Sequence, residues 1–217
     1  MISFQNQEFR LTTEETSYWF RVTPFGHLEH VYYGARLPDT QDMEPLALKH
    51  SIAAGGMVAY SEKDSAYSLD TLCLEWSGIG KGDFRDTPAE IKMPDGTFTT
   101  DFNYQSHTIT DGCAPMRTLP SAYGSAEDCQ TLAVTLLDGS NRVTLTLYYS
   151  VYTKTDVITR RAVLENGNET PLTIRKMLSM MLDMPNDAFR MITFDGNWIK
   201  EAHRHDGVLC AFVPRMA

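Results

Sequence analysis

Apolar and polar residues alternate along much of this chain with a period of two, which is the pattern of half-buried β-strands. The alternation is clearest in residues 131–182, where four runs follow one another with turn-forming residues between them. In the run 143–152, the apolar positions of one face are Val143, Leu145, Leu147 and Tyr149. Residues 138–141 and 165–168 are rich in Asp, Asn and Gly and supply two of the turns. These runs predict consecutive strands of a β-sandwich.

Shorter runs extend this prediction to an all-β fold. We expect further strands at residues 2–4, 9–12, 17–23, 28–33, 97–111, 189–194 and 207–213. At most one or two short helices are expected, one of them near residues 45–48. Because a chain of 217 residues often forms one all-β domain, we expect a single large two-sheet antiparallel sandwich over residues 1–217.

The charge balance argues against several classes of partner. The formal net charge is −9 and no basic run offsets it, so the phosphates of a nucleic acid would be repelled. No apolar run approaches the roughly 20 residues of a membrane span, and the N-terminal residues lack the pattern of a secretory signal. The four cysteines are widely spaced without a CxxC pair, which indicates reduced thiols. We therefore expect a cytoplasmic protein that binds neither nucleic acid nor membrane.

Residues 51–90 form a long irregular stretch, and such a stretch inside a compact domain is usually functional or interface-forming. Its strongest motif is LEWSGIGKGDFR at residues 74–85, where three alternating glycines allow a close approach of another backbone. The motif matches neither a dinucleotide-binding fingerprint nor a phosphate-binding P-loop. Glu75, Asp83 and Arg85 predict a local group of ion pairs that pins this loop, with contact to a substrate as the alternative.

No combination of residues predicts catalysis. His203 and His205 share a strand face without a third ligand nearby in the sequence, so no metal site is expected. The carboxylates fall at strand ends and turns, and their spacing does not place two of them across a sugar as a glycosidase requires. We expect no cofactor. Most aromatic residues fit core positions, and Tyr67 and Trp76 in the irregular stretch are the candidates for exposed contacts.

Six blocks of the sequence occur in an order that resembles one enzyme family. The blocks are SYWFRVTPFGHLEHVYYGARL, YSLDTLCLEWSGIGKGDFR, LPSAYGSAEDCQTLAVTLLD, LYYSVYTKTDVITRRAVLENG, SMMLDMP and FDGNWIKEAHR. Together they resemble the N-terminal region of glycoside hydrolase family 36 α-galactosidases, over roughly residues 1–206. The resemblance implies a large antiparallel β-supersandwich of the galactose mutarotase-like type. It also implies that the catalytic aspartates lie in a (β/α)8 barrel that follows, so no catalytic residue is expected in this chain.

The resemblance therefore implies a supporting function. We expect a non-catalytic N-terminal domain of an enzyme that removes terminal α-linked galactose from oligosaccharides such as raffinose, with retention of configuration. Its partners would be the α-galactoside oligosaccharide, its own barrel and further copies in a homo-oligomer. Tetrameric members of the family extend a loop of this domain towards a neighbouring active site, and the matching segment is residues 60–67. Asp64, with Tyr67 beside it, is the candidate contact to a galactoside hydroxyl.

Two functions of other classes stay open at this point. An independent carbohydrate-binding module would need an exposed aromatic platform. A sugar epimerase of mutarotase-like fold would need a histidine and a carboxylate that converge in a sheet cleft, and the strand-associated histidines are His27, His30 and His107. Calorimetric titration with galactosides and an assay of galactose mutarotation separate these functions from a supporting domain.

Overall fold

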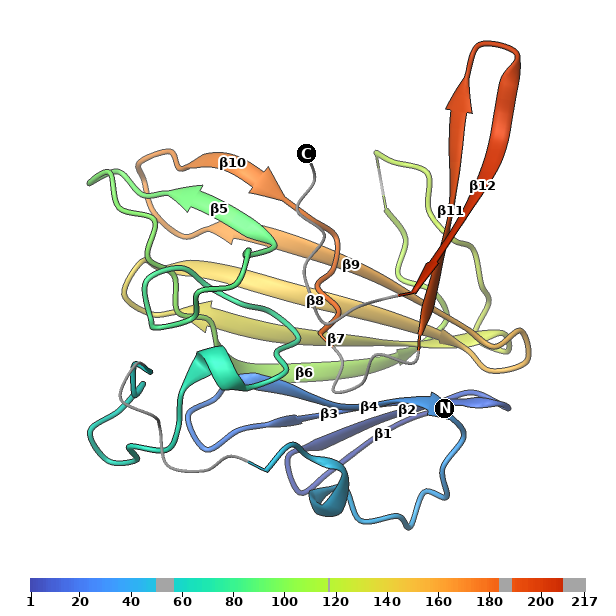
Figure 1. Cartoon of the computed structure of the whole chain (residues 1–217), viewed down its shortest axis with the longest axis horizontal. Helices are drawn as coiled ribbons and strands as arrows, with labels where there is room; N and C mark the ends of the chain where they lie inside the picture. The colour runs from blue at the N-terminus through green and yellow to red at the C-terminus, as the bar shows by residue number, and fades with distance from the viewer. Residues whose placement is uncertain (50–56, 117, 184–188, 209–217) are drawn as a thin grey trace. The chain divides into compact units, whose positions relative to one another are not determined.

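The computed structural model describes residues 1–49, 57–116, 118–183 and 189–208. The chain divides into two compact units, Met1–Asp183 and Met184–Ala217. In the described residues the regular structure consists of β-strands and two short 3-10 helices, η1 (Glu44–Leu46) and η2 (Leu69–Thr71) (Figure 1). The helix η1 lies where a short helix is expected from the sequence.

The N-terminal sheet is a four-stranded antiparallel meander. Its strands are β1 (Ile2–Gln5), β2 (Glu8–Thr12), β3 (Thr16–Val22) and β4 (Leu28–Ala35), paired in the order β1-β2-β3-β4. The turn between β1 and β2 has positive φ angles at Asn6 and Gln7, which is the geometry of a tight hairpin whose twist matches its strands. Alternation in β2 turns Phe9 and Leu11 into the core and Glu8 and Arg10 away from it.

The second sheet contains the strands whose alternation is clearest in the sequence. Its strands are β6 (Asn103–Asp111), β7 (Cys129–Asp138), β8 (Val143–Tyr152) and β9 (Val157–Asn166), again in an antiparallel order β6-β7-β8-β9. Leu132 lies opposite Tyr149 and Leu136 opposite Leu145, so the apolar positions of neighbouring strands share one face. The predicted bounds of β8 are confirmed residue for residue.

A smaller two-stranded sheet pairs β5 (Ala89–Lys92) with β10 (Thr173–Met177). Strand β5 begins within the last two residues of the stretch 51–90, which was expected to be irregular throughout, and continues to Lys92. It was not predicted because four residues are too few to show a period against the surrounding Gly and Pro. The last of the four runs expected within residues 131–182, which spans residues 172–182, is confirmed only for its first half, since residues 178–183 leave the sheet.

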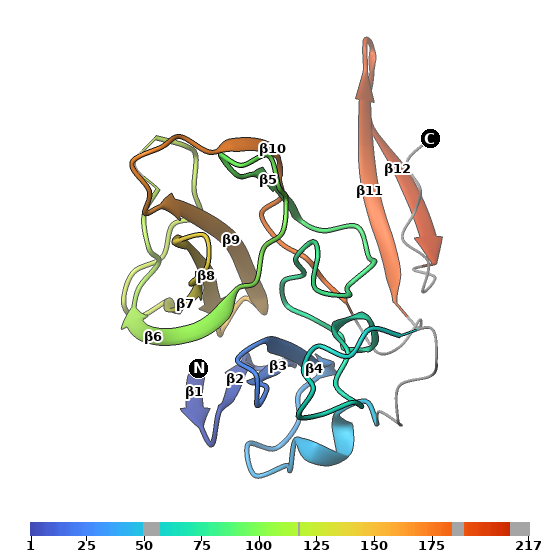
Figure 2. The ribbon, with the colours of Figure 1, turned by 90° about the vertical axis from the view of Figure 1, so that its left-hand side faces the viewer.

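The main core lies between the two four-stranded sheets, which face one another as two layers in Figure 2. Phe9 stacks on Phe20 within the N-terminal sheet with centroids 4.8 Å apart, and Phe20 links the two layers by stacking on Tyr149 of β8 at 5.1 Å. All three side chains are fully buried. The all-β sandwich predicted from the sequence is therefore confirmed.

The second unit, in its described residues, is an antiparallel hairpin of β11 (Arg190–Asn197) and β12 (Lys200–Val208). The strand expected at 189–194 is confirmed, but its partner begins at Lys200, and the remainder of the strand expected at 207–213 lies outside the described residues. His203 and His205 consequently lie within a strand, and His205 Nε2 is 2.8 Å from Asp195 Oδ2. No group of three or more metal-ligating side chains occurs in the described residues.

No helix in the part of the chain that the structure describes is long and apolar enough to span a membrane.

Candidate functional site

The segment from Tyr60 to Tyr67 forms a narrow loop, here called the 60–67 loop. Its two ends are joined because the Tyr60 backbone N–H donates to the Tyr67 carbonyl at 2.9 Å. Ser61 and Asp64 form an isolated β-bridge within it, and Asp64 Oδ1 accepts a hydrogen bond from the Ala66 backbone N–H at 3.0 Å. Ser and Asp favour such turns because their side chains bond to nearby backbone groups. Asp64 is exposed near the tip of the loop, which leaves its carboxylate accessible to another molecule.

A polar cluster holds the base of the 60–67 loop against the body of the domain. Tyr67 Oη lies 2.6 Å from Thr23 Oγ1 and 3.0 Å from His27 Nδ1. The other imidazole nitrogen, His27 Nε2, lies 3.1 Å from Asp101 Oδ1, and Tyr60 Oη donates to Asp101 Oδ2 at 2.9 Å. We call His27, Tyr60, Tyr67 and Asp101 the loop anchor. Both tyrosines that bound the loop are thus tied to one histidine–aspartate pair.

The electrostatics of the loop anchor favour an ionised aspartate and neutral tyrosines. Burial opposes the charge on Asp101, yet the hydrogen bonds from His27 and Tyr60 and the nearby Lys81 hold the pKa of Asp101 below its ordinary value. Burial and the neighbouring Asp101 raise the pKa of Tyr60 to about 12. The pKa of Tyr67 is also raised, chiefly by burial. A tyrosine with a raised pKa stays protonated at neutral pH, so both hydroxyl groups remain hydrogen-bonding groups of the anchor.

Apolar contacts complete the support of the loop. Phe25 packs on Tyr67 with ring centroids 4.6 Å apart and on Tyr60 at 5.4 Å. A small apolar cluster beneath the loop contains Leu69, Leu72 and Leu74 and is also covered by Met181. The 60–67 loop therefore has a packed base and a polar tip, which suits it to present a carboxylate rather than to perform chemistry itself.

Trp76 is not available for exposed contacts, contrary to the prediction. Only 6% of its surface is exposed, and it packs in the main core with residues of both large sheets. Trp76 therefore fills core volume, although the backbone around it is irregular. Of the two aromatic candidates, only Tyr67 belongs to the 60–67 loop, and it lies at the base of the loop.

Glu75 does not pair with Asp83 and Arg85, which corrects the predicted ion-pair group. Its carboxylate is fully buried and accepts hydrogen bonds from Tyr18 Oη and Tyr149 Oη, each at 2.6 Å. His30 Nδ1 lies 2.9 Å from Glu75 Oε1 and Arg160 Nη2 lies 2.9 Å from Glu75 Oε2. We call Glu75 and these four partners, Tyr18, His30, Tyr149 and Arg160, the buried Glu75 cluster.

The pairing of Asp83 with Arg85 is confirmed. Arg85 Nε lies 2.9 Å from Asp83 Oδ1, and its Nη1 also pairs with Asp183. The same guanidinium donates to the backbone carbonyls of Leu69 and Leu72. Arg85 therefore joins η2, its own loop and residue 183, so the predicted pinning of the loop is present with more partners than expected.

The sequence did not reveal the loop anchor, because His27 and Asp101 lie far apart in the chain and neither belongs to a local motif. His27 and His30 each do have a carboxylate partner, as an epimerase would require. However, the His30–Glu75 pair has side chains only 1% exposed, so a sugar has no access to it. The His27–Asp101 pair is covered by the two tyrosines of the loop.

Comparison with known proteins assigns the chain to one protein family. The family model described as the glycosyl hydrolase family 36 N-terminal domain matches residues 26–209. The bifunctional alpha-galactosidase/sucrose kinase AgaSK of Mediterraneibacter gnavus is 31% identical over 193 residues, which cover 89% of this chain and 20% of that protein. Alpha-galactosidase AgaA of Geobacillus stearothermophilus is 31% identical over 199 residues, which cover 91% of this chain and 27% of that protein.

Solved structures agree with the sequence relatives. The galactosidase domain of AgaSK superposes with a TM-score of 0.88 at 29% identity, covering 96% of this chain and 29% of that one. A structure of AgaA in complex with raffinose gives a TM-score of 0.86 at 29% identity, with 94% and 28% covered, and another holds stachyose. The chain thus spans less than a third of the length of each of these proteins.

Proposed function

The chain belongs to the glycosyl hydrolase family 36 N-terminal domain family, and we propose that it supports the catalytic part of an α-galactosidase without supplying a catalytic residue. The family match over residues 26–209 carries this proposal. The lengths of the relatives support it, since this chain corresponds to only 20% and 27% of the two α-galactosidases compared. The two carboxylates needed for glycoside hydrolysis with retention would come from the remainder of the parent enzyme.

The proposed substrate of the parent is an oligosaccharide with a terminal α-linked galactose. The complexes of AgaA with raffinose and stachyose support this class of substrate. A parent that assembles as a homo-oligomer in the cytoplasm is part of the same proposal. The free cysteines in the described part, Cys73, Cys113 and Cys129, suit a reducing compartment.

A direct test compares hydrolysis of a chromogenic α-galactoside by the 217-residue chain and by the longer parent at equal molar concentration. We expect turnover only with the parent. Turnover by the short chain that survives further purification would overturn the proposal, because it would require a catalytic pair within these residues.

We further propose that the tip of the 60–67 loop borders the substrate entrance of the parent, with Asp64 accepting a hydrogen bond from a galactoside hydroxyl. The packed base and the exposed carboxylate of the loop support this role. In the parent, Asp64→Ala should raise KM for raffinose at least several-fold, since a hydrogen bond to a charged group is worth about 1.5–3 kcal/mol. The matched control is Glu62→Ala, which removes another exposed carboxylate of the same loop. Equal KM values for both variants would exclude the contact.

Residues 178–183 supply a surface on which the remainder of the parent is proposed to dock. Leu178, Met180 and Leu182 are 49%, 39% and 38% exposed, whereas Met181 between them packs inward under the 60–67 loop. Arg160 Nη1 holds this segment by donating to the Met181 carbonyl at 2.7 Å. A row of apolar side chains held outward on a fixed backbone is typical of a covered surface. More than two thirds of each relative compared lies outside the matching region, which supports the catalytic part as the occupant.

This docking is tested with Leu182→Glu in the parent. We expect a lower thermal midpoint in the parent and a smaller decrease in the 217-residue chain, where Leu182 is already 38% exposed. Leu119→Glu is the matched control, because Leu119 is more exposed and lies on a different loop. A midpoint of the parent that does not move with Leu182→Glu would exclude this surface.

A further inference from the structure

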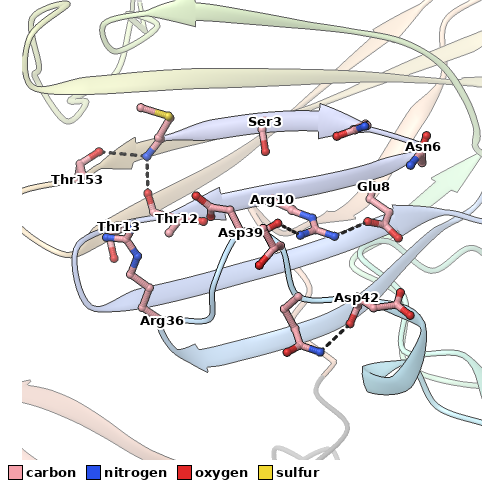
Figure 3. Close-up of a pocket in the computed structure, with 14 residues that line it drawn as sticks. Ser3, Asn6, Glu8, Arg10, Thr12, Thr13, Arg36, Asp39, Asp42 and Thr153 are labelled. Atoms are coloured by element: carbon pink, nitrogen blue, oxygen red, sulfur yellow. Dashed lines mark hydrogen bonds and ion pairs between the residues drawn. The ribbon is translucent and has the colours of Figure 1, made fainter.

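A polar pocket of about 730 Å³ lies on the outer side of the β1-β2-β3-β4 sheet, away from the 60–67 loop residues (Figure 3). Its floor consists of side chains that alternate with core residues on β1 and β2, and its wall is the segment of residues 36–42 that follows β4. We call this the outer pocket. Its volume lies within the range of ligand sites for small molecules, roughly 300–1,000 Å³. The lining residues used below are Ser3, Glu8, Arg10, Arg36, Asp39 and Asp42.

The central side chain of the outer pocket is held in one orientation. Arg10 Nη2 donates to Glu8 Oε2 at 2.7 Å, and its Nη1 donates to the backbone carbonyl of Asp39. The guanidinium also lies over the ring of Trp19, 4.7 Å from the centroid, and this ring is fully buried. Figure 3 shows Arg10 between Asp39 and Glu8. A cation fixed in this way loses little side-chain entropy when a ligand binds.

The wall of the pocket is anchored at both ends. At its start, the Arg36 backbone N–H donates to the Glu15 carbonyl at 2.7 Å, and the Leu37 N–H donates to Ser17 Oγ at 3.0 Å. At its end, Met43 is fully buried in a cluster with Trp19. The cavity therefore exists before any ligand arrives.

The chemistry of the lining selects for a neutral ligand rich in hydroxyl groups. Two arginines, Arg10 and Arg36, and the N-terminal ammonium group line the pocket with three carboxylates, Glu8, Asp39 and Asp42, so neither sign of charge dominates. The other described lining residues are mainly hydroxyl and amide side chains, and none is aromatic. An anionic ligand would meet the carboxylates and an apolar ligand would leave the polar groups unpaired. A sugar chain, in contrast, offers both donors and acceptors at every ring.

We propose that the outer pocket is a non-catalytic binding site for an oligosaccharide, in addition to the catalytic site of the parent. The proposal rests on the proposed function only for the choice of galactose-containing oligosaccharides as probes. Without an aromatic ring among the described lining residues, affinity comes from hydrogen bonds, and we expect a Kd in the millimolar range, about 4 kcal/mol of binding free energy. Such a site would hold the parent near polymeric or clustered substrate.

The test is titration of the isotope-labelled 217-residue chain with raffinose and stachyose, monitored by the NMR shifts of backbone amides. We expect saturable shifts in β1, β2 and residues 36–42. Ser3→Tyr places a ring over the floor from an exposed position of β1 and should abolish these shifts. Arg36→Ala should weaken binding about tenfold, the loss expected for one hydrogen bond to a charged group. The matched control Arg175→Ala, at an exposed arginine of β10, should bind like the original chain.

Two results would overturn the proposal. One is the absence of saturable shifts at tens of millimolar sugar, roughly ten times the Kd expected for this class of contact. The other is tighter binding of inorganic phosphate at the same residues, which would assign the pocket to an anion. The accessory function is tested separately, by turnover of a chromogenic α-galactoside, which does not depend on the outer pocket. The proposal of a binding site in the outer pocket and the proposal of an accessory function can therefore be refuted independently of each other.

Discussion

The buried Glu75 cluster should contribute a large share of the stability of this domain, and Glu75→Gln measures it. The substitution keeps the size of the side chain but leaves the charge of Arg160 without its partner. The side chains of Glu75 and Arg160 are only 1% and 5% exposed. Breaking a buried ion pair by neutralising one partner typically costs about 3–5 kcal/mol, because the remaining charge is left uncompensated. We therefore expect Glu75→Gln to lose about 3–5 kcal/mol of unfolding free energy at pH 7.

The lowered pKa of Glu75 gives a similar value for the stabilising free energy. Burial alone would raise this pKa, but Arg160, His30 and Tyr149 outweigh burial and lower it from 4.5 to about 2. This difference is equivalent to roughly 3 kcal/mol in favour of the folded, charged form. Because the pKa is lower in the folded state than in the unfolded chain, the stabilisation is fully present above pH 4.5 and is lost as the pH falls towards 2. The difference between the original chain and Glu75→Gln should shrink over the same interval.

The assay is urea unfolding at pH 7 and at pH 3, followed by tryptophan fluorescence and by far-UV circular dichroism. Glu62→Gln is the matched control, since it makes the same chemical change at an exposed position, where substitutions usually change stability by less than about 0.5 kcal/mol. A loss below about 1 kcal/mol for Glu75→Gln at pH 7 would refute the reasoning, as that is the cost of an ordinary hydrogen bond. A loss that is equal at both pH values would refute the assignment to the charge of Glu75.

Three further predictions concern the irregular stretch. Arg85→Met should lower the free energy of unfolding by about 2–4 kcal/mol, because two backbone carbonyls and two carboxylates lose their hydrogen-bond donor. Amide hydrogen exchange should also become faster in residues 69–72, and unchanged exchange there would contradict the role of Arg85 as a link. Gly80→Ala should lower the thermal midpoint, since Gly80 has a φ of +91° and a Cβ there would clash with the side chain of Thr99. Gly96→Ala is the matched control, because Gly96 has a similar φ of +89° but open space around the new Cβ, so the comparison isolates the effect of the clash. Asp101→Asn should increase proteolytic cleavage within the 60–67 loop, and the increase should be larger at pH 7 than at pH 3. The reason is that the pKa of Asp101 is lowered in the folded state, so the stabilisation that the charged carboxylate provides is lost as the pH falls. Equal cleavage of the variant and the original chain at pH 7 would argue against the loop anchor.

The sandwich was predictable because its strands carry a local signal. In β8, Val143, Leu145, Leu147 and Tyr149 alternate with polar residues, and all four are buried in the core. Strand β5 was missed because its four residues, AEIK, are too short for a period to emerge. Its place in the fold is decided by pairing with β10, which lies some 80 residues further along the chain and is invisible to a local pattern.

The candidate site was predictable only where its contacts are short-range in sequence. Asp83 and Arg85 are two residues apart in an irregular segment, so their side chains can pair through a short-range contact. Glu75, in contrast, finds Tyr18, Tyr149 and Arg160 at separations of 57, 74 and 85 residues, so its partners depend on how the sheets pack. Trp76 was assigned to the surface for the same reason, since irregular backbone carries no period that reports which side faces the core.

Covalent labelling of the nucleophile tests the central claim most directly. A galactose-configured cyclophellitol epoxide reacts with the catalytic carboxylate of a retaining α-galactosidase, and mass spectrometry of peptides locates the labelled residue. We predict that the parent enzyme takes up one probe molecule at a carboxylate outside residues 1–217 and that the 217-residue chain alone takes up none. A labelled aspartate or glutamate within residues 1–217, protected by an excess of galactose, would contradict the account and place catalysis in this domain.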